Sequence, residues 1–471
     1  MASFTLGTPI HPGSATGTDT LKRALHQSRI VIEATEPVID QGGFACKAVI
    51  GQAVRVSTTV FADGHDQLGA ELLWRPVAAT HWQRCVLEPL GNDRWQAAFT
   101  PTSIGLHVFA IESWWDLFAT YRYELQKKHG AGVVVTLEVE EGRIHLQQAL
   151  ARANVSDQAR AVLHDVQGRL AAAREEDEQV TLLLTPELAR VMAELDERRH
   201  LTRSPDYPLD VERERAQFAS WYELFPRSET DQPSRHGTFA DVARRLPDIR
   251  DMGFDVLYFP PIHPIGRAHR KGPNNALVAG PDDPGSPYAI GGEAGGHEAI
   301  HPQLGSREDF RQLLRQAQAH GLEIALDFAI QCSQDHPWLK EHPGWFSWRP
   351  DGSIRYAENP PKKYQDIVNV DFYAEQALPE LWLALRDIVQ GWVDEGVKIF
   401  RVDNPHTKPL PFWEWLIADI RGRDPEVIFL AEAFTRPAMM ARLGKIGYSQ
   451  SYSYFTWRNT KAELSADFSL L

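Results

Sequence analysis

The alternation of apolar and polar residues changes character twice along the chain, and the first pattern predicts strands. From about residue 29 to 128, short segments such as 53–60 and 94–99 alternate apolar with polar side chains, and turn formers such as Gly91-Asn92-Asp93 separate them. Short strands at this regular spacing are typical of a β-sandwich. We therefore expect a flexible leader over 1–28 and a β-sandwich over 29–128.

The middle of the chain has long runs with few helix breakers, which predicts helices. Ser156 stands where it can cap one run, and Thr185-Pro186 opens another with proline in the tolerated first turn. We expect a small helical insert over 129–215, and contact between subunits is one use for it.

From residue 216 to 471, apolar strand-like segments alternate with helical ones. We expect six strands and the helices between them, at the following positions: strands 218–225, 254–259, 322–327, 397–402, 427–432 and 448–455; helices from Thr238, over 306–320 and over 376–393. Alternation of this kind predicts a parallel sheet, here an α/β barrel of the TIM type. Two Gly/Pro- or Trp/Pro-rich excursions, 263–301 and 332–370, interrupt it, and loops of such length are usually functional.

The predicted strands deliver acidic residues at their carboxyl ends. Asp327, Asp403 and Glu432 each end an apolar run, and Arg401 lies two residues before Asp403, so both side chains point the same way on a strand. A guanidinium beside a carboxylate keeps the carboxylate ionised. Two carboxylates at neighbouring strand ends are what a retaining glycosidase needs, one as nucleophile and one as acid/base.

Composition narrows the class of partner. The formal net charge is −14, which argues against nucleic acid or an anionic membrane. No segment of about 18 apolar residues and no signal-type leader occurs. The three cysteines, Cys46, Cys85 and Cys332, form no disulfide framework, so we expect the reducing cytoplasm. No cofactor is expected, and no metal, because His406 has no second ligand at metal spacing.

These motifs resemble the α-amylase superfamily, in which Arg-x-Asp, a later Glu and an earlier Asp occur in this order at strand ends. The chain departs from the usual pattern, since Asp327 is followed by Phe328-Ala329-Ile330-Gln331-Cys332 where amylases have x-x-x-Asn-His. The nucleophile is followed by Asn404-Pro405-His406-Thr407-Lys408. Both departures, with the motifs at 432–437 and 450–461, resemble the bacterial maltosyltransferases that use α-maltose 1-phosphate.

The resemblance implies roles for named residues. Asp403 is the nucleophile, and Arg401 supports it. Glu432 is the acid/base. The donor is α-maltose 1-phosphate and the acceptor an α-1,4-glucan, and the family forms homodimers. The residues implied in binding the phosphate or the maltosyl group are Lys271, Asn275, Ser286, Tyr288, Gln331, Asn359, Lys362, Tyr364 and Asn404.

Two other functions stay open: an amylase-type α-glucan hydrolase or transglycosylase, and an inactive carbohydrate-binding fragment. Only Glu463 and Asp467 are acidic after Glu432, and neither follows a further predicted strand. The family's third carboxylate, which stabilises the transition state, is therefore expected to be absent. We expect a barrel that is incomplete at its C-terminal end, from a chain that is truncated, and exposed strand edges that favour aggregation.

Overall fold

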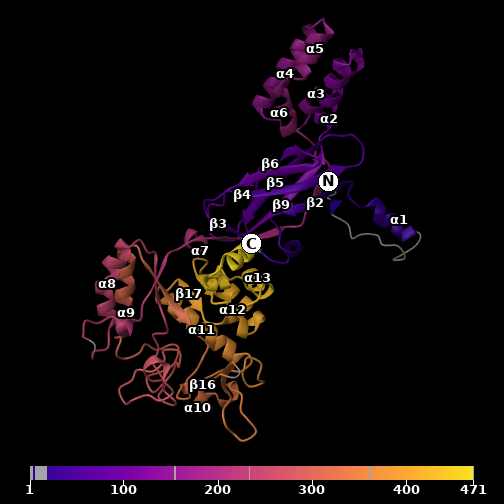
Figure 1. The fold of residues 1–471 in the computed structure, drawn as a ribbon. Coiled ribbons are helices and arrows are strands. Elements are labelled where there is room, and N and C mark those ends of the chain that lie inside the picture. Colours follow the sequence, from indigo (N-terminus) through magenta and orange to yellow (C-terminus); the bar gives the residue numbers. More distant parts are fainter. Residues whose placement is uncertain (1–3, 6–17, 153–154, 233, 360–361, 470–471) are drawn as a thin grey trace. The chain divides into compact units, whose positions relative to one another are not determined.

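A computed structural model of the chain describes residues 4–5, 18–152, 155–232, 234–359 and 362–469 (Figure 1). The chain divides into two compact units, Met1–Asp210 and Val211–Leu471. Among the described residues, no helix combines the length and the apolar character that a membrane span requires.

The N-terminal unit is built on two sheets. The strands are β1 (Phe4–Thr5), β2 (Ile30–Glu36), β3 (Cys46–Val49), β4 (Val54–Ala62), β5 (Leu68–Pro76), β6 (Gln83–Val86), β7 (Glu88–Gly91), β8 (Arg94–Phe99), β9 (Gly105–Trp115), β10 (Arg199–Arg203) and β11 (Tyr207–Glu212). One sheet has the order β2-β4-β8-β7, and the other has the path β1-β10-β9-β11-β3 with β5 and β6 attached through β9. Along β4, every second residue from Val54 to Val60 is buried, which is the period of a strand with one buried face.

Five helices of this unit pack around one apolar cluster (Figure 1). They are α2 (Leu117–Gly130), α3 (Thr136–Leu150), α4 (Asp157–Ala172), α5 (Glu176–Leu183) and α6 (Pro186–Glu194). The predicted cap at Ser156 is confirmed, because its hydroxyl accepts a hydrogen bond from the Ala159 amide. Pro186 occupies the first turn of α6, as the sequence predicted.

Two features of this unit differ from the sequence prediction. The segment expected to be a flexible leader contains helix α1 (Thr18–Leu25), which has an acidic residue in its first turn and basic residues in its last, as the helix dipole favours. The range expected to be helical begins after α2 has started, because Asp116 caps that helix at the Ala119 amide. The same range ends in two strands, β10 and β11.

The second unit contains a six-stranded parallel sheet with the order β12-β13-β14-β17-β18-β19. Its strands are β12 (Trp221–Glu223), β13 (Val256–Phe259), β14 (Glu323–Phe328), β17 (Ile399–Val402), β18 (Ile428–Ala431) and β19 (Gln450–Ser451). All four residues of β13, β17 and β18 are buried, as expected of strands covered on both faces. The predicted parallel sheet is confirmed.

Helices precede, connect and follow these strands. They are α7 (Glu214–Gln217), α8 (Phe239–Asp251), α9 (Arg307–Ala319), α11 (Glu380–Asp394), α12 (Leu410–Arg423), α13 (Pro437–Lys445) and α14 (Lys461–Phe468). Helix α8 packs on α9, and α11 packs on α12 (Figure 1). The predicted start of α8 is confirmed, because Thr238 and Asp241 form a capping box. Gly321 follows α9 with a φ of 75°, which glycine adopts without strain.

The two edge strands are shorter than predicted. The first was expected over 218–225 but spans three residues, because α7 precedes it and a turn at Pro226–Ser228 follows. The last was expected over 448–455 but spans two, because the chain turns at Tyr454–Trp457. In the described chain β12 and β19 are not paired with each other, and residues of both line a cavity of about 540 Å³.

The two excursions have different structures. The first joins β13 to α9 with one short turn, Pro273–Asn275, as its only helical or extended element among the described residues. The second contains a helix, α10 (Pro337–Glu341), a short turn, Pro343–Trp345, and a hairpin of β15 (Tyr356–Asn359) and β16 (Lys362–Val368). The sequence did not predict this hairpin.

Candidate active site

One buried guanidinium holds three carboxylates together at the carboxyl edge of the parallel sheet. Arg401 Nη1 lies 2.8 Å from Asp327 Oδ2 and 3.0 Å from Asp403 Oδ1, and Arg401 Nη2 lies 2.7 Å from Glu432 Oε1. The side chain of Arg401 is only 7% exposed, and that of Glu432 is 18% exposed. The three acidic residues that the sequence singled out are therefore brought together, with Arg401 between them.

Backbone hydrogen bonds of the sheet hold Asp403 and Glu432, each of which directly follows a strand. The Asp403 amide donates to Phe328 O at 3.1 Å, and the Glu432 amide donates to Val402 O at 3.0 Å. The pairing of β14 with β17, and of β17 with β18, thus continues one residue past each strand. Both carboxylates are held on backbone that cannot shift without breaking the sheet.

Asn404 turns the chain away immediately after Asp403. Its φ of 42° lies in the left-handed region, which asparagine tolerates better than most residues. Its amide lies 3.3 Å from Glu432 Oε2, and its side-chain Nδ2 lies 3.4 Å from Asp403 Oδ1. The residue therefore contacts both carboxylates that the chemistry would use.

Asp327 is the most enclosed of the three acids, with a side chain fully shielded from solvent. Its Oδ2 accepts hydrogen bonds from Tyr258 at 2.5 Å and Tyr288 at 3.0 Å, besides Arg401. Burial raises the pKa of the Asp327 carboxyl to about 7, although Arg401 acts in the opposite direction. Its Oδ1 is buried without a partner among the described residues.

Glu432 is suited to exchange a proton. Burial raises the pKa of its carboxyl, Arg401 opposes this shift, and the neighbouring Asp403 adds to it. A general acid that must hold its proton until the leaving group needs it benefits from such a raised pKa.

Gln331 contacts Asp403, the predicted nucleophile. Its Nε2 donates to Asp403 Oδ2 at 2.9 Å, so both oxygens of this carboxylate have donors. The residue after it, Cys332, is fully buried and pairs with Val368 through two backbone hydrogen bonds, which joins this segment to β16.

A buried pair of histidines supports the same segment. His297 Nε2 lies 2.9 Å from Ala329 O, and His297 Nδ1 lies 3.2 Å from His336 Nε2. The Trp338 amide donates to His336 Nδ1, so the proton of this neutral ring is on Nε2 and faces His297. Burial lowers the pKa of His297 to about 4 and that of His336 to about 2, which keeps both rings neutral.

With Cys332, these two histidines are the described group whose ligand atoms could hold a metal ion. The sequence considered only His406 as a ligand and did not predict this group. A metal on His336 Nε2 would displace its proton to Nδ1, where it would meet the Trp338 amide and break the hydrogen bond by which His336 caps α10. Burial also raises the pKa of the Cys332 thiol, which disfavours the thiolate that binds metals. The hydrogen-bond chain thus fits these residues better than a metal does.

Only some of the predicted binding residues have described contacts at or near the site. Tyr288 reaches the site through its bond to Asp327, and the Ser286 hydroxyl accepts from the Tyr288 amide at 3.3 Å. Tyr364 packs against a small cluster that contains Ala289, which joins the two excursions. Lys271 and Asn275 make no hydrogen bond or ion pair with any described residue. The side chains of Asn359 and Lys362 lie outside the described part of the chain.

The two acidic residues after Glu432 are used locally. Glu463 forms a capping box with Thr460 at the start of α14. Asp467 pairs with Arg458 at 3.0 Å. In the described chain, neither joins the carboxylates held by Arg401.

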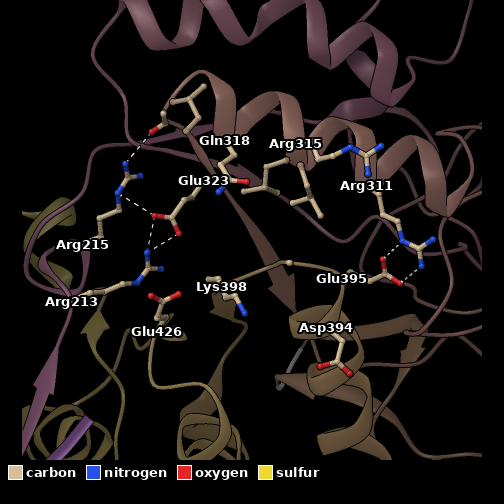
Figure 2. Close-up of a pocket in the computed structure, with 15 residues that line it drawn as sticks. Arg213, Arg215, Arg311, Arg315, Gln318, Glu323, Asp394, Glu395, Lys398 and Glu426 are labelled. Carbon is tan, nitrogen blue, oxygen red and sulfur yellow. Dashed lines mark hydrogen bonds and ion pairs between the residues drawn. The ribbon is translucent and has the colours of Figure 1, made fainter. Parts of the chain in front are cut away.

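A cavity larger than the one beside β12 and β19 lies at the opposite edge of the parallel sheet, where the strands begin. It has a volume of about 870 Å³ and includes Glu323, Lys398 and Glu426, which stand at the amino ends of β14, β17 and β18. Figure 2 shows ion pairs in its walls: Arg213 and Arg215 pair with Glu323, and Arg311 pairs with Glu395. Active sites of barrels lie at the carboxyl ends of the strands, so this cavity is not the candidate active site.

Some contacts at the site were not predicted from the sequence. Tyr258 is one, because its reach to Asp327 depends on the register of β13 against β14. The only signal was a tyrosine near the end of an apolar strand. The bond from Gln331 to Asp403 is another, since the resemblance assigned Gln331 to the maltosyl group.

Comparisons with known proteins agree with this geometry. Residues 28–213 match the family profile described as "Alpha-1,4-glucan:maltose-1-phosphate maltosyltransferase, domain N/S", and residues 223–408 match "Alpha amylase, catalytic domain". A protein of Pseudomonas aeruginosa named alpha-1,4-glucan:maltose-1-phosphate maltosyltransferase is 60% identical over 96% of this chain and 68% of its own length. The chain belongs to this maltosyltransferase family.

Two further relatives with the same name differ in how much of them the chain covers. The protein of Cereibacter sphaeroides is 56% identical over 93% of this chain and 73% of its own length. The protein of Burkholderia pseudomallei is 59% identical over 93% of this chain and 39% of its own length. The chain thus spans between about two fifths and three quarters of these maltosyltransferases.

Proposed function

We propose that this chain transfers maltosyl units from α-maltose 1-phosphate to the non-reducing end of α-1,4-glucans, with retention, and releases phosphate. The observation that carries the proposal is Arg401 holding Asp403 and Glu432 at the ends of adjacent strands in a chain of the maltosyltransferase family. The family names supply the donor and acceptor, and the carboxylates supply the chemistry.

The reaction proceeds in two displacements. Asp403 attacks the anomeric carbon, the bond to the phosphate oxygen breaks, and Glu432 donates its proton to the departing phosphate. A maltosyl ester on Asp403 results. Glu432, now ionised, then takes the proton of the acceptor 4-hydroxyl as that oxygen attacks the same carbon and frees Asp403. Two inversions leave the α-configuration unchanged.

The supporting residues have distinct tasks in this scheme. Arg401 keeps Asp403 ionised, and Gln331 orients the other oxygen of the same carboxylate. Tyr288 lies under the reacting sugar, with its hydroxyl fixed by Asp327. The remaining assignments follow the family resemblance: Lys271 and Asn275 for the maltosyl group, and Ser286, Asn359, Lys362, Tyr364 and Asn404 for the phosphate.

The broader organisation is also proposed. We assign a β-sandwich to 29–128, a helical insert to 129–215, and the partial barrel to 216–471. A homodimer is expected from the family, with the helical insert as one contact surface. The three free thiols suit the reducing cytoplasm.

Phosphate release measures the proposed reaction directly. The chain is incubated with α-maltose 1-phosphate, with and without glycogen, and phosphate, maltose and glucan length are followed. We expect phosphate release that depends on glycogen, with glucan growing by two glucose units at a time. Release of maltose without glucan growth would instead indicate a hydrolase, and growth by other units a different transglycosylase.

A further inference from the structure

The donor carries a negatively charged phosphate into a site that already holds three acids. The only cation bound to these acids among the described residues is Arg401, and it is shared between all three. The positive charge of Arg401 is thus already paired with these three carboxylates. Besides Lys362, which the resemblance assigns to the phosphate, a further positive charge that is not paired with a carboxylate would stabilise a phosphate beside Glu432.

The turn that follows the nucleophile is fixed in place. The Thr407 hydroxyl donates to Asn404 O at 2.8 Å, and the amide of Lys408 donates to Pro405 O at 3.1 Å. The indole of Trp413, which is fully buried, also donates to Pro405 O at 2.9 Å. Residues 405–408 therefore keep a defined position relative to Asp403.

Lys408 extends from this turn with an incompletely used ammonium. Its Nζ lies 3.0 Å from the Thr407 hydroxyl, and it forms no ion pair with any carboxylate of the described chain. The side chain is half-buried. An ammonium has three donors, so two remain available for a ligand.

Hydrogen bonds link this charge to the reacting groups through Asn404, because the Thr407 hydroxyl that contacts Lys408 Nζ donates to Asn404 O, and the Asn404 amide lies 3.3 Å from Glu432 Oε2. Burial lowers the pKa of the Lys408 ammonium, while Asp403 and Glu432 are near enough to act in the opposite direction. In the same turn, the buried Nδ1 of His406 has no hydrogen-bond partner among the described residues. One turn thus carries an ammonium with unused donors and a ring nitrogen without a partner among the described residues.

We propose that Lys408 is a further binding residue, whose ammonium contacts the phosphate of the sugar 1-phosphate donor and of the departing phosphate. This inference rests on the proposed function. It adds to the site a cation that the family resemblance did not assign, and it explains why a half-buried lysine five residues after the nucleophile lacks an acidic partner.

Two donors that differ only in the leaving group test this role. The full chain and its Lys408→Met variant are assayed with α-maltose 1-phosphate and with α-maltosyl fluoride, on the same glucan. A charge-assisted hydrogen bond contributes about 1.5–3 kcal/mol, so the ratio of kcat/KM between the phosphate and the fluoride should fall about 10- to 150-fold. Lys408→Arg should recover part of the ratio, and Lys461→Met, an exposed lysine of α14, should leave it unchanged.

The inference is wrong if the Lys408→Met variant loses the same factor with both donors, or if only its KM for glucan rises. A wild-type chain that uses maltosyl fluoride but not α-maltose 1-phosphate overturns the proposed function itself. Calorimetry that compares the affinity for α-maltose 1-phosphate with the affinity for maltose tests the same role of Lys408 without turnover. Wild type should prefer the phosphate, and the Lys408→Met variant should lose most of that preference.

Discussion

Replacing Arg401 by methionine removes the only cation, among the described residues, that pairs with the buried Asp327 and Asp403 and the partly buried Glu432. The side chains of Asp327 and Asp403 are 0% and 8% exposed, so water cannot replace the lost partner. Removing one member of a buried ion pair costs about 3–5 kcal/mol. We expect the free energy of unfolding of the C-terminal unit to fall by this amount at pH 7.5.

Acid should lessen the defect of the Arg401→Met variant. At pH 5 the Asp327 carboxyl, with its pKa of about 7, is protonated in the folded protein and no longer needs the guanidinium. We therefore expect a loss at pH 5 that is smaller by at least about 1 kcal/mol.

Urea unfolding with hydrogen exchange of peptides that contain β17 (Ile399–Val402) measures the loss in this unit. The control is Arg311→Met, because Arg311 is 45% exposed, Arg307 still pairs with Glu395, and an exposed ion pair contributes at most about 1 kcal/mol. Equal losses in the two variants, or a loss independent of pH, would refute the account of Arg401.

Two more variants test Asp327 and Asn404. Asp327 has a folded pKa of about 7 and an unfolded value near 3.9, so the folded state binds the extra proton and wild-type stability falls as pH rises from about 4 to about 7. In the Asp327→Asn variant, the urea midpoint should no longer fall through this contribution as the pH rises. A midpoint that depends on pH as steeply as in the wild type would contradict this prediction. Asn404 has a φ of 42°, so Asn404→Ala should be about 1–2 kcal/mol less stable than Asn404→Gly in the same titration, while equal stabilities would mean that the turn relaxes.

The sequence predicted where the acidic residues of the candidate site lie, because local pattern determines where a buried strand ends. Apolar runs that stop at Asp403 and Glu432 could be recognised without knowing the packing, and the sheet then brings those ends together. The bond from Tyr258 to Asp327 could not be predicted in this way, since it depends on which residues of β13 and β14 are paired.

Errors in the fold prediction have similar causes. Strands β10 and β11 lie in a range whose composition suits helices, and their pairing with β9 decides their structure. The hairpin of β15 and β16 lies in the Trp/Pro-rich segment 332–370, whose composition is typical of a loop. Edge strands β12 and β19 are short because turns at Pro226 and Tyr454 interrupt the apolar runs that suggested longer strands.

The central claim is that Asp403 carries the maltosyl group between donor and acceptor. In Glu432→Gln the second displacement lacks its base, and general acid–base groups contribute about 10²- to 10⁴-fold, so an intermediate made from α-maltosyl fluoride should accumulate. Mass spectrometry of the digested protein then gives the decision. The account predicts one maltosyl group on the peptide that contains Asp403, which added glucan removes only slowly because the base is missing. Turnover with no such adduct, or an adduct on another residue, would contradict it.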